Sequence, residues 1–98
     1  MLKVENFYNK NQFLIREGEK LILQSYNSIV AIWDNEKQTL VLGRDWNYSR
    51  TTTKHIYLFI YDFVRNSKIK EVNEKKNKRD FINKLIKENV IKYDKNLV

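Results

Sequence analysis

The side chains with the most chemical potential stand together between residues 46 and 55, in the sequence WNYSRTTTKH. Hydroxyl and cationic groups there fall at the start of a predicted helix, where free backbone amides and the helix dipole favour an anion. The segment could therefore hold a phosphate or a carboxylate of a partner, through Trp46, Tyr48, Arg50, Thr51, Lys54 and His55. The alternative is a helix start that caps itself through Ser49 and leaves its cations in solvent.

The sequence offers few residues and no motifs for binding a metal or for acid–base catalysis. His55 is the only histidine, the chain has no cysteine, and neither an HExxH motif nor a Cys/His pair occurs. Asp62 lies two helical turns away, too far to chelate a metal directly with His55, although a metal held by His55 and carboxylates from elsewhere stays open. The acidic residues show no pairing typical of a glycosidase or a nuclease. We therefore expect a protein that is not an enzyme and that uses no cofactor or metal.

The charge of the chain is uneven. The net charge is +7, of which residues 1–50 contribute +1 and residues 51–98 contribute +6. The basic side chains concentrate between Arg65 and Arg79, where Lys75, Lys76 and Lys78 stand close together. Such a basic half predicts an anionic partner, either nucleic acid or an acidic protein surface. The alternative is a solubilising face of lysines without a specific partner.

The helix that carries these residues is predicted from Ser49 to Arg65. Ile56, Phe59, Ile60 and Phe63 recur at helical spacing and should pack against the face of a sheet. A second face is also apolar, through Tyr57, Leu58, Tyr61 and Val64, so the helix should either pack on two sides or bind a partner. Several aromatic side chains could stack on nucleic-acid bases, or could simply fill the core: Trp33, Trp46, Tyr48, Tyr57 and Tyr61.

Strands are predicted before this helix, and a second helix is predicted after it. Alternating or continuous apolar runs indicate strands at Gln12–Arg16, Leu21–Gln24, Ile29–Trp33 and Thr39–Leu42. The continuous run from Ile29 to Trp33 is typical of a central strand covered on both faces. Residues 1–11 are expected to form a frayed arm or a short helix. Gly18 should supply the positive φ of a hairpin turn.

The second helix should begin at the cap Asn77 and end at a left-handed Asn89, before a short strand from Val90 to Tyr93 that can rejoin the sheet. Between the two helices, Ile69 and Val72 could anchor one helical turn. The expected fold is a single α+β domain over residues 1–98, an antiparallel meander of three to four strands followed by two helices.

No feature of the sequence directs the chain to a membrane. The N-terminal segment lacks the apolar core of a signal peptide, and the longest apolar run, from Ile56 to Ile60, is far shorter than a bilayer requires. The lack of cysteine fits a reducing compartment. We therefore expect a cytoplasmic protein with no membrane partner, whose oligomeric state the sequence leaves open.

Two segments carry a resemblance to a known group of proteins. The segments SYNSIVA (residues 25–31) and WNYSRTTTKH (residues 46–55), with a basic tail from Phe81 to Ile91, resemble small uncharacterised proteins of phages and plasmids of low-GC Gram-positive bacteria. The chain departs from their pattern at Ser28, where threonine is expected. The resemblance implies an accessory protein of a mobile element, a class that includes anti-CRISPR proteins, other defence antagonists and small nucleic-acid binders.

Together these observations lead to one expectation and one alternative. The chain should act by stoichiometric binding to a host protein or nucleoprotein complex, as an inhibitor of the anti-CRISPR type directed at an RNA-guided nuclease. The alternative is a basic accessory or regulatory protein that binds nucleic acid directly. A small metal-dependent enzyme is disfavoured because the sequence offers no catalytic cluster.

Overall fold

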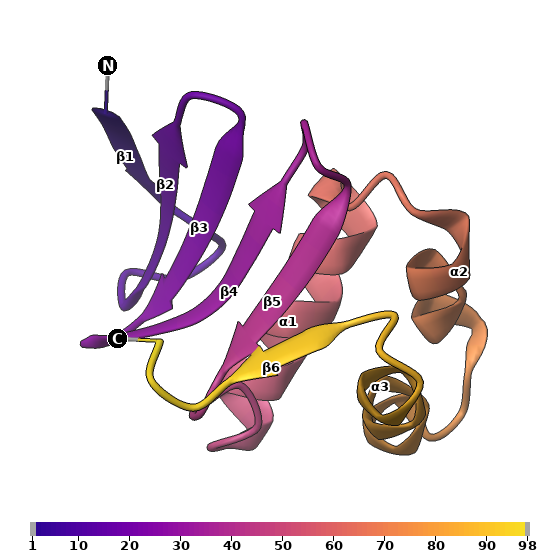
Figure 1. The fold of residues 1–98 in the computed structure, drawn as a ribbon. Helices are drawn as coiled ribbons and strands as arrows, with labels where there is room; N and C mark the ends of the chain where they lie inside the picture. The colour runs from indigo at the N-terminus through magenta and orange to yellow at the C-terminus, as the bar shows by residue number, and fades with distance from the viewer. Residues whose placement is uncertain (1, 98) are drawn as a thin grey trace.

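The computed structural model describes residues 2–97, which form a six-stranded sheet with its helices gathered on one face (Figure 1). The strands lie in the sheet in chain order, and each neighbouring pair is antiparallel except β5 and β6, which are parallel. The strands are β1 (Leu2–Asn6), β2 (Gln12–Glu17), β3 (Lys20–Ser25), β4 (Ser28–Asp34), β5 (Thr39–Gly43) and β6 (Lys92–Asp94). The helical elements are α1 (Arg50–Phe63), α2 (Ser67–Lys70), the 3₁₀ turn η1 (Glu71–Glu74) and α3 (Lys78–Lys87).

The α+β class is confirmed, but the sheet has more strands than the sequence predicted. The expectation of an arm or a short helix in residues 1–11 is wrong, because Leu2–Asn6 forms β1 at the edge of the sheet. Apolar Leu2 and Val4 alternate with charged Lys3 and Glu5, which is the period of a strand and not of a helix. A hairpin joins β1 to β2, and the backbone amide of Phe7 donates to the carbonyl of Gln12 at 2.8 Å.

The C-terminal strand rejoins the sheet, as the sequence predicted, but it begins at Lys92 instead of Val90. The two residues before it end α3: the backbone amides of Val90 and Ile91 both donate to the carbonyl of Leu85, at 2.9 and 3.2 Å. Asn89 has φ +62°, so the left-handed residue expected there is confirmed. Because residues 90 and 91 close the helix, pairing with β5 starts only after them.

One face of the sheet forms the core beneath α1. Leu14, Leu23, Ala31 and Leu42 face one another across β2 to β5, and their side chains are almost completely buried. From α1, Ile56, Phe59 and Ile60 are fully buried in the same cluster. Gly18 has φ +59° in the β2–β3 turn, as expected. A register shift between Leu23 and Gln24 accommodates the Tyr26-Asn27 turn that precedes β4.

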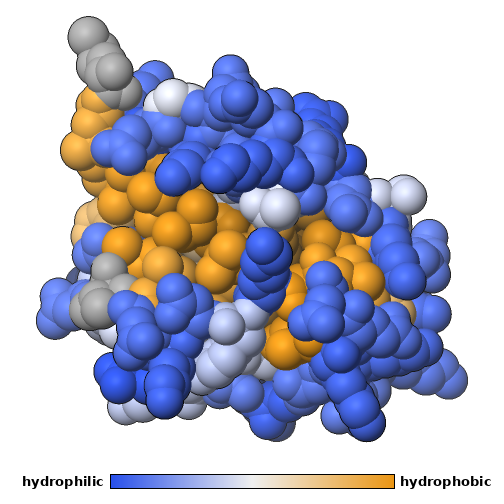
Figure 2. All heavy atoms as spheres, in the orientation of Figure 1, coloured by the Kyte–Doolittle hydropathy of each residue, from blue (hydrophilic) through white to orange (hydrophobic). Residues whose placement is uncertain are grey.

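The opposite face of the sheet is open, which corrects the expectation that the central strand is covered on both sides. The strand residues that alternate with Leu14, Leu23, Ala31 and Leu42 point to this opposite face. They form a row that crosses β1 to β5: Val4, Ile15, Ile22, Ile32 and Val41. Each of them keeps part of its surface exposed. Figure 2 looks onto this open face, where hydrophobic side chains run in a band inward from the β1 edge.

The far end of α1 differs from the expectation in two details. The helix ends at Phe63 because Val64 adopts an extended backbone, with its amide bonded to the carbonyl of Ile60 at 3.1 Å. Phe63 is only partly buried, and the guanidinium of Arg16 lies 5.3 Å from the centre of its ring. Phe59, one turn earlier, has no exposed surface and is the aromatic residue of α1 that is fully buried in the core.

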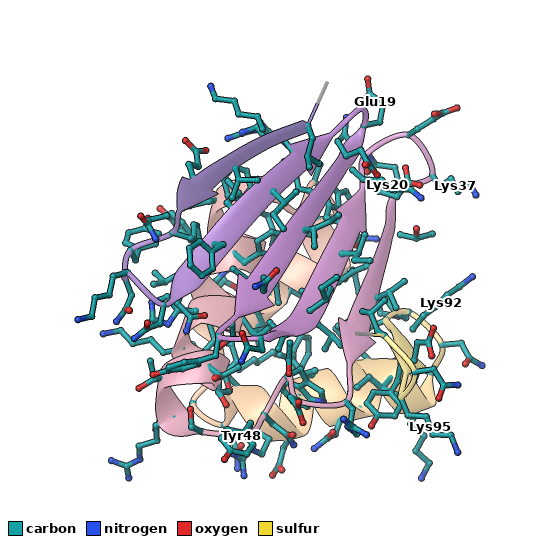
Figure 3. The ribbon with its side chains drawn as sticks, turned by 90° about the vertical axis from the view of Figure 1, so that its left-hand side faces the viewer. Glu19, Lys20, Lys37, Tyr48, Lys92 and Lys95 are labelled. Carbon is teal, nitrogen blue, oxygen red and sulfur yellow. The ribbon has the colours of Figure 1, made fainter. Side chains whose placement is uncertain are left out.

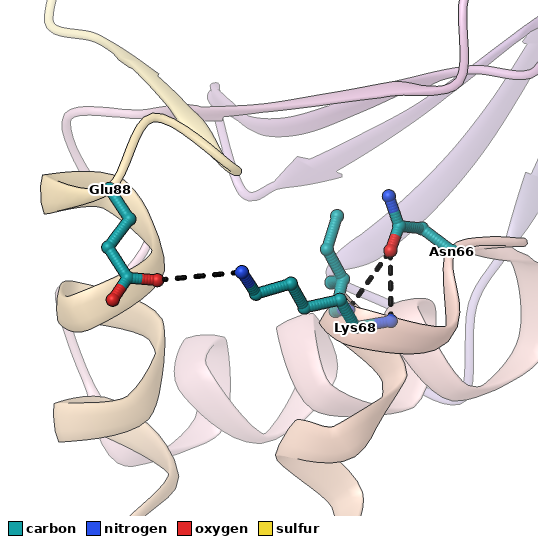
Figure 4. Close-up of polar contacts among 4 residues, drawn as sticks. Asn66, Lys68 and Glu88 are labelled. Atoms are coloured by element: carbon teal, nitrogen blue, oxygen red, sulfur yellow. Dashed lines mark hydrogen bonds and ion pairs between the residues drawn. The ribbon is translucent and has the colours of Figure 1, made fainter.

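The connector between α1 and α3 is more ordered than its charge suggested. Ile69 and Val72 are fully buried and anchor α2 and η1, so the expected single turn is extended into two short helical elements. The side chain of Asn66 caps α2 by accepting from the amide of Lys68 at 3.0 Å. The ammonium of Lys68 lies 3.8 Å from the carboxylate of Glu88 and links α2 to the end of α3 (Figure 4). Asn77 caps α3 through the amide of Asp80, as predicted.

Truncation of Phe59 tests the packing of α1 on the sheet. Phe59→Ala should lower the free energy of unfolding by about 3–5 kcal/mol, because it leaves a cavity at a fully buried position. The matched control is Tyr61→Ala, an exposed aromatic residue on the same helix, whose effect should stay within about 0.5 kcal/mol. Urea unfolding followed by circular dichroism measures both. A loss below about 1 kcal/mol for Phe59→Ala would contradict the packing described.

Candidate partner-binding surface

The start of α1 carries its own N-cap, as the self-capping alternative predicted. Ser49 is in an extended conformation, and its Oγ accepts from the amide of Thr52 at 3.1 Å. The hydroxyl of Thr53 donates to the carbonyl of Ser49 at 2.7 Å. These bonds are those of an N-cap, so the hydroxyl-rich segment has a structural role that needs no ligand.

A chain of buried hydrogen bonds ties this helix start to the sheet. The Nε2 of Gln12, on β2, donates to the hydroxyl of Ser25 at 2.9 Å, and that oxygen lies 3.1 Å from the hydroxyl of Thr52. Ser49 in turn donates to Thr52 at 3.2 Å. Gln12, Ser25 and Thr52 are all buried. The first turn of α1 is therefore held in place by β2 and β3.

An open pocket of about 660 Å³ lies beside this network. Its walls come mainly from the β3–β4 turn and from the segment that leads into α1. Tyr48 and Thr51 line the pocket, whereas Arg50 and Lys54 do not. The carboxylate of Asp45 also lines it and accepts from the hydroxyl of Ser28 at 2.9 Å. A negative group at this position disfavours an anion in the pocket.

Two of the residues expected to contact a partner are buried. Trp46 is only 3% exposed and belongs to the hydrophobic core. His55 is 5% exposed, its Nδ1 lies 2.7 Å from the carbonyl of Thr51, and its ring packs near Phe7. Neither side chain can reach a partner's surface while the protein stays folded, so neither Trp46 nor His55 is a partner-binding residue in this structure. Tyr48, in contrast, is 80% exposed and projects at one end of the molecule (Figure 3).

The outer face of α1 carries a stripe that the pocket does not include. Arg50, Lys54, Tyr57 and Tyr61 follow at intervals of four, three and four residues, which places them along one side of the helix. Arg50, Lys54 and Tyr61 are exposed and Tyr57 is partly exposed. Both tyrosines were predicted as possible stacking residues on the second apolar face of the helix, but they were not included in the expected anion site.

A cation from α2 borders this stripe, and a cation from α3 acts on it electrostatically. The ammonium of Lys70 lies 5.9 Å from the ring centre of Tyr61, within the range of a cation–π contact. Burial raises the pKa of the Tyr57 hydroxyl, and the positive charge of Arg79, on α3, partly opposes that rise. We use the term basic helical surface for the stripe, Lys70, Arg79 and the lysines around the start of α3: Arg50, Lys54, Tyr57, Tyr61, Lys70, Lys75, Lys76, Lys78 and Arg79.

The three lysines around the start of α3 differ in their contacts. Lys75 and Lys76 are exposed, and Lys78 is partly exposed. The ammonium of Lys75 lies 5.0 Å from the ring centre of Phe81, and that of Lys78 donates to the carbonyl of Lys75 at 2.8 Å. The contacts of Lys75 and Lys78 hold two of the three charges in defined positions at the start of α3. Of the three lysines singled out in the sequence, two are therefore oriented by contacts within the protein.

Two further properties of the described residues bear on function. Within residues 2–97, no group of three or more His, Cys, Asp or Glu side chains is placed to hold a metal ion. In the same part of the chain, no helix is long and apolar enough to cross a membrane.

The amino-acid sequence matches one family model. Residues 1–84 fit the family of unknown function DUF8033. The chain belongs to this family. The matched residues include β1 to β5, α1, α2, η1 and the first part of α3, but not β6. The pocket and the basic helical surface therefore both lie within the matched region. No match was found among curated proteins or among solved structures.

Removal of the cap tests the structural role of the helix start. Ser49→Ala should lower the free energy of unfolding by about 0.5–2 kcal/mol, because the amide of Thr52 loses its acceptor. The control is Thr51→Ala, an exposed hydroxyl two residues later, with an effect within about 0.5 kcal/mol. Thermal and urea unfolding of both variants provide the comparison. Equal losses in the two variants would mean that the Ser49 hydroxyl is not the cap.

Proposed function

We propose that this protein acts by stoichiometric binding, without catalysis, as an accessory protein of a phage or another mobile element in the bacterial cytoplasm. Its partner is an anionic surface of a host nucleoprotein, and an RNA-guided nuclease is the first candidate. The observation that carries the proposal is the separation of charge between the two layers of the fold. Between residues 50 and 91, which form the helical layer, eleven basic side chains stand against five acidic ones.

The sheet side of the chain provides the contrast. Residues 1–49, which form β1 to β5 and their turns, hold six basic and six acidic side chains and so carry no net charge. The excess charge is therefore not a uniform coat of solubilising lysines, because such a coat would also cover the sheet side. A field concentrated on one layer steers an anionic partner toward that layer.

The aromatic residues in the basic helical surface add a second argument. Tyr61 is 63% exposed and has a lysine over its ring, and Tyr57 is partly exposed. Tyrosine and arginine are among the residue types that most often dominate the energetics of protein interfaces. A solvated face of charges would have no use for these two aromatic side chains.

Direct binding of nucleic acid is the second candidate function, and the same stripe favours it. Cations that stand beside aromatic rings on one surface can track a phosphate backbone while the rings stack on unpaired bases. The two candidates differ in their salt dependence. Binding to bare nucleic acid should weaken by roughly tenfold or more between low and physiological salt, whereas inhibition of a nuclease through shaped contacts should persist.

A cleavage assay tests the first candidate. The protein is titrated into purified RNA-guided nucleases with their guides, and cleavage of target DNA is measured at physiological salt. Inhibition should be complete near one equivalent. Anisotropy of labelled single-stranded DNA without nuclease, measured over the same salt range, tests the second candidate. Failure of inhibition together with strongly salt-dependent DNA binding would replace the first candidate by the second.

Charge reversal tests the basic helical surface. Lys75→Glu, Lys76→Glu and Lys78→Glu combined should reduce partner binding or inhibition by roughly tenfold or more, because they place like charges against the partner. The matched control reverses three lysines outside the helical layer, Lys10, Lys20 and Lys37. Lys20 and Lys37 lie at the end of the molecule away from Tyr48 (Figure 3).

Both triple variants change the net charge equally, so a general effect of charge would reduce binding equally. Thermal unfolding of each variant separates a loss of binding from a loss of fold. Equal binding by the two variants would show that the basic helical surface is not the contact surface.

A further inference from the structure

The outer edge of β1 is open to another strand. β1 pairs with β2 on one side, and no other strand of the described residues pairs with it on the other side (Figure 1). Natural sheets often protect such an edge with charged side chains, a proline, a bulge or a very short strand, and of these devices β1 has only the charges of Lys3 and Glu5. β1 has five residues, it contains no proline, and its register with β2 is regular. Its apolar residues are among the most exposed of the chain, with Leu2 at 58% and Val4 at 54%.

The hydrogen-bond pattern fixes which backbone groups of β1 face outward. In an antiparallel pair, alternate residues direct their amide and carbonyl groups to the neighbouring strand. The amide of Phe7 bonds to Gln12 of β2, so Glu5 and Lys3 also direct their backbone groups inward. Leu2, Val4 and Asn6 therefore present their amides and carbonyls at the open edge.

This alternation limits how a second copy of β1 could pair with the first. An antiparallel symmetric pair must oppose outward-facing residues, so its two-fold axis passes through residue 3, 4 or 5. An axis at Lys3 places Lys3 against its own copy, and an axis at Glu5 places Glu5 against its own copy. Like charges directly opposite each other are destabilising. An axis at Val4 instead places each Lys3 against Glu5 of the second copy.

We infer that two copies of this chain associate edge to edge through β1, with Val4 opposite Val4, and form a continuous twelve-stranded sheet. Leu2 pairs with Asn6 of the second copy, and the outward amides and carbonyls gain partners. The two Lys3–Glu5 contacts fall at positions without direct hydrogen bonds, where opposite side chains lie closest. The chain's net charge of +7 opposes association in general, so an edge with self-complementary charges is where two copies can meet.

The pairing has consequences for the rest of the surface. The two-fold axis is perpendicular to the sheet, so both open faces lie on one side and the apolar row that begins at Val4 continues from one copy into the next. Both helical layers lie on the opposite side. The inference does not depend on the proposed function, but it would place two basic helical surfaces on one side of a single assembly.

Charge exchange in β1 provides the test. Sedimentation velocity of the full chain over micromolar to millimolar concentration should show a dimer for the parent. Lys3→Glu alone and Glu5→Lys alone should each raise the dimer dissociation constant by about tenfold, because each opposes like charges twice. An equimolar mixture of the two variants should recover the parent's association, since every acidic side chain of one variant then meets a lysine of the other. The controls Lys37→Glu and Glu36→Lys, in the β4–β5 turn, make the same changes of charge away from the edge.

Backbone substitution gives an independent measurement. Val4→Pro removes an amide that faces outward, so it should abolish the dimer while circular dichroism and thermal unfolding remain close to those of the parent. The inference is overturned by a parent chain that stays monomeric at millimolar concentration. It is equally overturned if the two single-charge variants dimerise as the parent does, or if their mixture fails to recover association.

Discussion

The attachment of α1 to the sheet determines the arrangement of everything that follows it. Phe59, Ile56 and Ile60 place the helix on the row of leucines beneath it, and the hydrogen bonds from Gln12 through Ser25 to Thr52 fix its first turn. The hydrophobic contact supplies most of the free energy, whereas the buried polar chain specifies position, because the Nε2 of Gln12 and the hydroxyls of Ser25 and Thr52 reach one another in only one alignment. α2, η1 and α3 pack around α1 or around one another, so the position of α1 also sets where the basic side chains lie.

This arrangement gives the two layers different characters. The helical layer carries the excess positive charge, and its outer stripe combines Arg50 and Lys54 with the rings of Tyr57 and Tyr61. Residues 1–49 on the sheet side carry no net charge, and the open face is partly apolar and ends at the edge strand β1. An anionic macromolecule is attracted to the first layer and gains little from the second. The open face and edge of the sheet are instead better matched to a neutral partner or to a second copy of the same edge.

Much of the fold could be predicted from the sequence, since the relevant signals are local. The caps Ser49 and Asn77, the left-handed Asn89 and the turn at Gly18 depend on residue type at one position, and all four were confirmed. β1 was missed because five residues with two apolar side chains carry a weak signal until β2 pairs with them. The burial of Trp46 and His55 depends on packing between distant segments, which no local pattern encodes. Arg50 and Lys54 were expected at one corner with Tyr48 and Thr51, but only Tyr48 and Thr51 line the pocket, because residues adjacent in sequence face different sides of a helix.

The account depends most on the claim that the basic helical surface is where an anionic partner binds. Nuclear magnetic resonance of the ¹⁵N-labelled protein, titrated at low salt with a short single-stranded DNA as an anionic probe, tests that claim residue by residue. The account predicts that the largest amide shifts occur at Arg50, Lys54, Tyr61, Lys70 and Arg79, with the open face of the sheet nearly unchanged. Largest shifts at Lys10, Lys20 and Lys37, or shifts spread evenly over the whole surface, would contradict it.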